Sequence, residues 1–278
     1  MARVANVRFD GCLVASAMAV APMVAPLIGG ILDALFGWQS IFVFAAVVCL
    51  IVFVWTATLL PETSPQAVHG AAKESFSGNL RFLFTNPRFV GYVLTAAFGS
   101  GAFFVFVGGG PHVLITMMHR SPTEYGLWFL GVAGGYIVGN IITSRLSMRW
   151  GIDKTLWFGI LIEFGGGLFG VAAVPLIDLV GPIAIVVPSF IIGVGNGVLL
   201  PNSIAGAVSI RPQAAGTASG FLGFTQMSFG ALTAQLSGYV VANTHSALAF
   251  MIHMFLICAG GVVVFLTLIR SSRPAGKS

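Results

Sequence analysis

A single glutamate stands well inside a long apolar run of this sequence. Glu163 lies in LWFGILIEFGGGLFG, and Asn196, in IIGVGNGVLLPN, falls at about the same depth of the next apolar run. An ionisable side chain inside an apolar span is costly and marks function by default. Two interpretations are open: a Glu–Asn hydrogen bond that holds two helices together, or a carboxyl group that binds a proton.

Aromatic and small residues alternate in a second run, YVLTAAFGSGAFFVFVGGGP, which contains Phe98 and Phe103. Rings beside small residues can form an adaptable pocket for flat apolar or cationic molecules, and they can equally be packing or lipid contacts. Gln226, in GFTQMSFG, is in the middle of a later run and adds an amide that is either a ligand or an interhelical hydrogen-bonding group.

Motifs of enzymatic chemistry are missing from the sequence. There is no HExxH, GxSxG, Walker A or kinase set, and the three cysteines are scattered through apolar runs without metal-ligand spacing. The GVGNG around Gly195 follows no strand and lies inside an apolar run, so it is not a nucleotide-binding loop. We therefore expect no enzyme activity, no metal and no cofactor.

Composition identifies the solvent of these runs. Residues of the AVILMFWYC set make up 57% of the 278 residues, charged residues 8%, and the mean hydropathy is +0.97. A soluble domain carries roughly a quarter charged residues, so we expect an all-α integral membrane protein. The eight predicted spans are Cys12–Leu35, Ser40–Leu60, Phe89–Gly109, Gly126–Leu146, Leu156–Leu176, Ile183–Pro201, Ala218–Val240 and Ala247–Ile269.

Basic residues between the runs predict the orientation. Of the 13 Lys and Arg residues, 12 fall on one side of the membrane and Arg120 alone falls on the other. The positive-inside rule makes that richer side cytoplasmic, with both termini there. The net charge of +5 is thus an orientation signal and requires no nucleic-acid partner.

The longest connection divides the chain unequally. We predict two spans in residues 1–60, a cytoplasmic central loop in residues 61–88, a six-helix bundle in residues 89–270 and a cytoplasmic tail in residues 271–278. A block of six spans is a complete half of several transporter architectures, whereas a block of two is not.

The first runs carry a pattern that resembles a known family. Their order is APxxGG, then FGWQSIF, then a span that ends in LPET. This order resembles helices five and six of major facilitator transporters, and among these transporters it is most similar to the Bcr/CflA multidrug efflux group. The antiporter motif of that group matches Ala25, Pro26, Gly29 and Gly30. A proline inside a spanning helix is tolerated because neighbouring helices satisfy the freed carbonyls.

A second motif supports the resemblance. RLSMRWG, with a glycine upstream, resembles the second copy of the cytoplasmic loop motif of the family, carried here by Gly139, Arg145, Arg149 and Gly151. The sequence departs from that motif where the family has an acidic and a further basic residue; Met148 and Ile152 stand there.

The resemblance implies a fold and a function. It implies a major facilitator fold with about eight transmembrane helices, two from the N-terminal bundle and a complete six-helix C-terminal bundle, in an N-terminally truncated chain. It implies proton-coupled efflux of drugs or other small molecules across the bacterial inner membrane, driven by the proton gradient. The alternative is a non-transporting relic, or a partner subunit that needs the missing helices from another chain. The oligomeric state is open.

The resemblance also assigns residues to the substrate cavity. Phe98 and Phe103 on the seventh family helix, Asn196 on the tenth and Gln226 on the eleventh are placed to face it. Glu163 falls on the ninth helix, which is peripheral in the family, and this weakens a direct proton role for it.

Overall fold

The computed structural model describes residue 25, residues 28–59 and residues 76–272, and it contains helices and no strand within those parts. Residues 28–36 form the first described helix. It is followed by α2 (Gln39–Leu59), α3 (Phe76–Thr85), α4 (Pro87–Pro111), η1 (His112–Met117), α5 (Pro122–Trp150), α6 (Ile152–Ala173), η2 (Val174–Leu176), α7 (Ile177–Val180), α8 (Ile183–Ser209), η3 (Pro212–Ala214), α9 (Ala215–Thr244), α10 (Ala247–Val264) and η4 (Phe265–Arg270). The all-α prediction is confirmed.

Six described segments are long and apolar enough to cross a membrane, and they lie at six of the eight predicted spans. The predicted span Cys12–Leu35 lies largely outside the described residues. The predicted span Ala218–Val240 lies within α9, a helix of 30 residues that is not among the six. The reason is composition, because glycine, serine, threonine and two glutamines dilute its apolar residues.

Local sequence signals set several helix starts. Asn86 accepts hydrogen bonds from the backbone N–H groups of Arg88 and Phe89 and so caps α4, which begins with a proline. Ser121 and Glu124 form a reciprocal capping box at the start of α5. The turn from α5 to α6 is the single residue Gly151, whose φ of 76° is unfavourable for a side chain.

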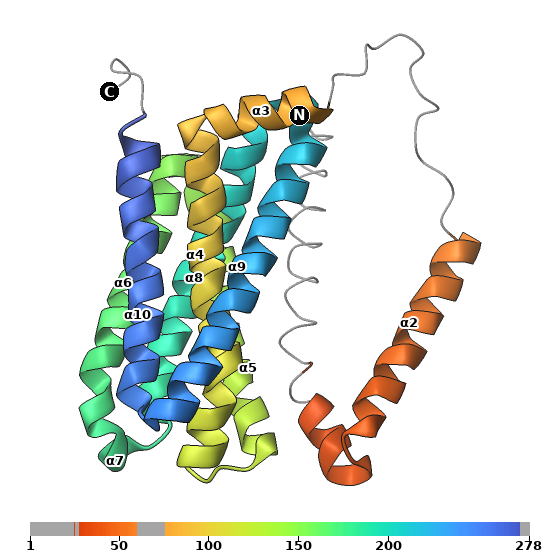
Figure 1. The fold of residues 1–278 in the computed structure, drawn as a ribbon, viewed down its shortest axis with the longest axis vertical. Helices are drawn as coiled ribbons and strands as arrows, with labels where there is room; N and C mark the ends of the chain where they lie inside the picture. The colour runs from red at the N-terminus through yellow and green to blue at the C-terminus, as the bar shows by residue number, and fades with distance from the viewer. Residues whose placement is uncertain (1–24, 26–27, 60–75, 273–278) are drawn as a thin grey trace.

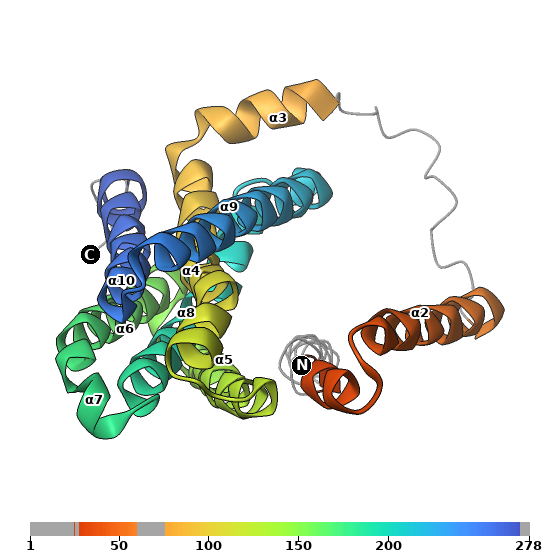
Figure 2. The ribbon, with the colours of Figure 1, turned by 60° about the horizontal axis from the view of Figure 1, so that its bottom comes forward.

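The helices from α4 to α10 form one bundle, with the long helices side by side (Figure 1). Within it α8 packs against α4, α5 and α6, and α4 also packs along α9 (Figure 2). Small residues permit these contacts. A methyl group at Gly139 would collide with the Val194 carbonyl of α8, and one at Gly135 would collide with the Phe190 carbonyl.

The segment before the bundle contains a short helix. A cytoplasmic loop was predicted for residues 61–88, and its last part contains the helix α3, which crosses one end of the bundle (Figures 1 and 2). Leu83 is fully buried, and the Phe84 ring meets the Phe221 ring of α9 at 4.5 Å. These apolar contacts fold the segment onto the bundle. Residues 60–75 lie outside the described part, and the domain boundaries stay predictions.

Candidate functional site

A cavity of about 650 Å³ lies between α4, α5, α8, α9 and α10. Six aromatic rings account for much of its wall: Phe103, Phe104, Phe106, Tyr125, Phe129 and Tyr136. Four uncharged polar side chains also line it, namely Ser100, Ser189, Asn196 and Gln226. A concave, mostly apolar space with a few polar groups is the usual form of a small-molecule site.

The rings of the cavity contact one another, and the pair that joins two helices edge to face is Phe103 with Phe129. The Phe103 and Phe129 rings are 5.8 Å apart at an interplanar angle of 66°, which joins the wall formed by α4 to the wall formed by α5. Such pairs add stability beyond the area they bury. The two walls therefore form one continuous aromatic surface.

Three of the residues predicted for the cavity line it, and the fourth does not. Phe103, Asn196 and Gln226 are among its lining residues. Phe98 is directed elsewhere: its ring lies 4.8 Å from the Phe229 ring and against Gly260 of α10. Five residues along a helix rotate a side chain by about 140°, so Phe98 and Phe103 face different directions. Both residues are phenylalanines of the same span, so residue type alone could not show which of the two rings faces the cavity.

Asn196 and Glu163 come together behind the cavity. The Asn196 Nδ2 atom donates a hydrogen bond of 2.6 Å to the Gly99 carbonyl oxygen of α4. Its side chain also interacts with the Glu163 carboxyl group of α6. Glu163 is only 2% exposed, and its Oε1 atom has no hydrogen-bond partner. The two residues thus lie against each other, and Asn196 also reaches a third helix.

A second polar group, which the sequence analysis did not identify, joins α5 to α8. Asn202 donates hydrogen bonds of 2.7 Å to the Thr143 hydroxyl and to the Val198 carbonyl, and it accepts one of 2.8 Å from Ser147. The four-residue spacing of Thr143 and Ser147, together with an asparagine in another span, is the signal that could have revealed it.

A third polar group ties the start of α4 to the start of α6. The Arg88 guanidinium forms an ion pair of 2.8 Å with Asp153, and the Tyr92 hydroxyl donates to the same carboxylate. This group lies beside the predicted loop motif but does not include its arginines. Arg145 and Arg149 are exposed, while Gly139 is buried against α8 and Gly151 forms the turn.

The predicted antiporter motif is only partly described. Pro26 lies outside the described residues. Ala25 lines the cavity, and Gly29 and Gly30 lie in the helix of residues 28–36. A methyl group at Gly30 would meet the Pro122 carbonyl oxygen at 3.4 Å, which places this helix against the start of α5. The glycine pair therefore lies where a preceding helix approaches the cavity wall.

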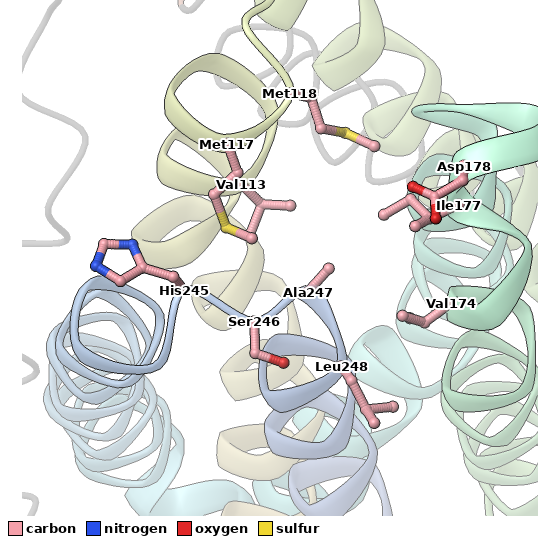
Figure 3. Close-up of a pocket in the computed structure, with 10 residues that line it drawn as sticks. All are labelled: Val113, Met117, Met118, Val174, Ile177, Asp178, His245, Ser246, Ala247 and Leu248. Carbon is pink, nitrogen blue, oxygen red and sulfur yellow. The ribbon is translucent and has the colours of Figure 1, made fainter.

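A smaller cavity of about 430 Å³ lies at the end of the bundle where α7 is found. Figure 3 shows Met118, Asp178 and Ala247 around it, while the His245 ring is directed away. The His245 ring lies 5.8 Å from the His112 ring. This cavity presents one carboxylate and two thioethers, and none of the predicted site residues lines it.

Comparison with known proteins covers most of the chain. Residues 12–234 match the family model described as Major Facilitator Superfamily. The chain is 28% identical over 250 residues to a bicyclomycin resistance protein homolog of Haemophilus influenzae, a match that spans 89% of this chain and 62% of that protein. It is 25% identical over 236 residues to the multidrug transporter MdfA of Escherichia coli O157:H7, which covers 83% of this chain and 56% of MdfA.

A third relative is a chloramphenicol resistance protein of Pseudomonas aeruginosa. The identity is 26% over 203 residues, which are 73% of this chain and 45% of that protein. The matched region thus spans between 45% and 62% of the length of these three relatives.

Proposed function

Because this chain belongs to the Major Facilitator Superfamily, we propose that it works in proton-coupled efflux of drugs or other small molecules from the bacterial cell. The chain is an integral membrane protein with six described apolar spans. The relatives named above are a multidrug transporter and two resistance proteins, which favours export over uptake. No described feature favours the alternative of a protein without transport activity.

The observation that carries this proposal is the aromatic cavity. Its volume of about 650 Å³ falls within the roughly 300–1,000 Å³ of small-molecule sites. The rings offer flat apolar surface and attract cations through their faces, while Asn196 and Gln226 offer hydrogen bonds. Since none of the described lining residues is charged, the cavity suits aromatic compounds that are uncharged or carry a diffuse positive charge.

The position of the glycine pair supports alternating access of the cavity to the two sides of the membrane. Gly30 lies against the backbone at the start of α5, and Tyr125, Phe129 and Tyr136 of α5 line the cavity. A shift of the preceding helix would therefore reach the cavity wall directly, as alternating access requires. We place both termini in the cytoplasm of an inner-membrane protein, and the energy source is the proton gradient, with no cofactor.

The test is transport by the full chain in proteoliposomes with an imposed pH gradient. We expect chloramphenicol to accumulate against its own gradient when the proton gradient is present, and the accumulation to collapse when a protonophore is added. Liposomes without protein are the control. Equal accumulation with and without the protonophore would contradict proton coupling, and no accumulation would contradict transport of this compound.

A further inference from the structure

Two histidines meet at the end of the bundle where α7 is found. The His112 ring, at the start of η1, lies 5.8 Å from the His245 ring, which stands in the turn between α9 and α10. The two residues are far apart in the sequence, and the packing of α4 along α9 brings them together.

Ring packing alone does not account for His112. Its Nε2 atom is buried and has no hydrogen-bond partner among the described residues. A neutral imidazole places either an N–H donor or a lone pair at that atom, and a buried polar atom without a partner is costly. Such an atom calls for a partner from outside the chain, namely a water molecule or an ion.

The distance between the rings fits two ligands of one metal ion. A Zn–N bond is about 2.0–2.1 Å, which places two imidazoles on one ion with their ring centroids roughly 5–6 Å apart. The observed 5.8 Å lies in that range. The His245 side chain is exposed, so its ring can turn a nitrogen toward His112 and leave the ion open to water.

The backbone holds both histidines in place. His245 ends α9 with a φ of 46° and an N–H that donates to the Val241 carbonyl, and the Ser246 side chain caps the start of α10. The His112 N–H donates to the Gly109 carbonyl at the end of α4. Ligands on such fixed elements lose little conformational freedom when an ion binds.

Neighbouring charges do not oppose a cation. Arg120 at this end is paired with Glu124 at 3.8 Å, and Asp178 lies across the adjoining cavity from His245 (Figure 3). No group of three or more His, Cys, Asp or Glu side chains gathers in the described part of the chain. The chain therefore supplies two imidazole nitrogens and leaves the other positions to water, a set of ligands that suits Zn²⁺ and Cu²⁺.

We propose that His112 and His245 bind one divalent transition-metal ion, Zn²⁺ or Cu²⁺, which joins the end of α4 to the turn between α9 and α10. Neither residue lines the aromatic cavity, so the site stands apart from the proposed function. The expectation of no metal rested on spacing along the sequence, which does not reveal a pair of ligands that packing brings together.

The first experiment measures Zn²⁺ binding to the purified full chain, prepared without a polyhistidine tag. Isothermal titration calorimetry in detergent should show a site for one ion per chain. His112→Phe keeps a ring in the buried position without a nitrogen, and His245→Asn keeps a residue type that tolerates a positive φ. Each variant should weaken binding by more than the roughly 10–100-fold that loss of a supporting hydrogen bond costs a metal site.

The matched control is His119→Asn. His119 is exposed and has a φ of 54°, so this variant makes the same replacement as His245→Asn without touching the pair. It should bind Zn²⁺ like the unaltered protein. Equal affinity in all three variants indicates an adventitious ion only and overturns the site, and so does the absence of binding to the unaltered protein.

The second experiment counts the nitrogens on the ion. Pulsed electron paramagnetic resonance of the protein with one equivalent of Cu²⁺ should show two coordinated imidazoles, and a single one in either variant. The ligands stand on different helices, so one variant tests the pair if the other does not fold. A single imidazole in the unaltered protein, or two in either variant, overturns the pair. Neither experiment depends on transport, so failure of the proposed function leaves both results interpretable.

Discussion

The helices α2 and α4 are both apolar, yet their surroundings differ completely. The α2 span has a mean hydropathy of 2.7 and buries no residue among the described ones, and it stands apart from the bundle (Figure 1). The α4 span has a lower mean hydropathy of 1.8, and 67% of its most apolar window is buried. The more apolar helix is thus the less buried one.

Small residues explain this difference. The α4 sequence contains six glycines together with alanine and serine, whereas α2 contains no glycine and presents Val, Leu, Ile and Phe on all sides. Lipid is as apolar as a leucine side chain, so apolar surface alone does not drive a helix to associate with other helices. Close approach of two backbones does favour association, because it adds van der Waals contacts and interhelical hydrogen bonds.

The largest effect is expected where α4 approaches another backbone. A side chain at Gly108 would collide with the Ala234 backbone of α9, so Gly108→Val must separate the two helices. Overpacking of this kind costs about 1–3 kcal/mol. We expect a clear fall in the thermal unfolding midpoint of the detergent-solubilised protein, measured by fluorescence.

The matched change on α2 is Ala46→Val, since Ala46 is exposed. It should leave the unfolding midpoint within the error of the measurement. If both variants lose the same stability, close packing does not distinguish α4 from α2.

A smaller effect, on binding, is expected from truncation of one ring in each helix. Phe103→Ala removes a ring of the cavity wall, and the loss of one ring contact with a bound aromatic compound, about 1.5 kcal/mol, corresponds to roughly a tenfold weaker affinity for chloramphenicol. Phe53→Ala removes a ring of α2 that is 69% exposed and should leave the affinity unchanged. Equilibrium binding to purified protein measures both values, and equal losses would show that the cavity is not the binding site.

The smallest effect is expected from removal of one hydroxyl group. Ser237 of α9 donates a hydrogen bond of 2.9 Å to the Val105 carbonyl of α4, so Ser237→Ala should cost about 0.6 kcal/mol, the typical value for such a bond in a membrane protein. Thr58 of α2 bonds to the Val54 carbonyl of its own helix, and Thr58→Ala should cost less. Denaturant unfolding in mixed micelles checks the order, and the reverse order would contradict the importance of contacts between helices.

Several features of the site were predictable because the signal lies in residue type. A carboxyl group in an apolar span is rare enough to stand out, and an asparagine at the same depth of the next span is its natural partner. Glu163 and Asn196 do meet. Phe103 and Gln226 line the cavity. They could be predicted for the same reason, because rings and amides in the middle of a span stand out in the sequence.

Other features required knowledge of which side of each helix faces the bundle. Phe98 carries the same chemistry as Phe103 but is directed at Gly260 of α10. Tyr125 and Tyr136 of α5 line the cavity, although nothing in their local sequence distinguishes them from residues that face lipid. Asn202, with its partners on α5, was missed in the same way.

The sequence by itself determined the solvent, the helical class and most spans, because each depends on the composition of about 20 consecutive residues. Only the tertiary structure decided which faces of those helices meet. In lipid that choice follows from backbone approach at glycines such as Gly108 and Gly139, and from single hydrogen bonds such as that from Asn196 to Gly99. Neither kind of contact can be recognised from the periodicity of hydropathy along the sequence, because the lipid-facing and protein-facing sides of a spanning helix are similarly apolar.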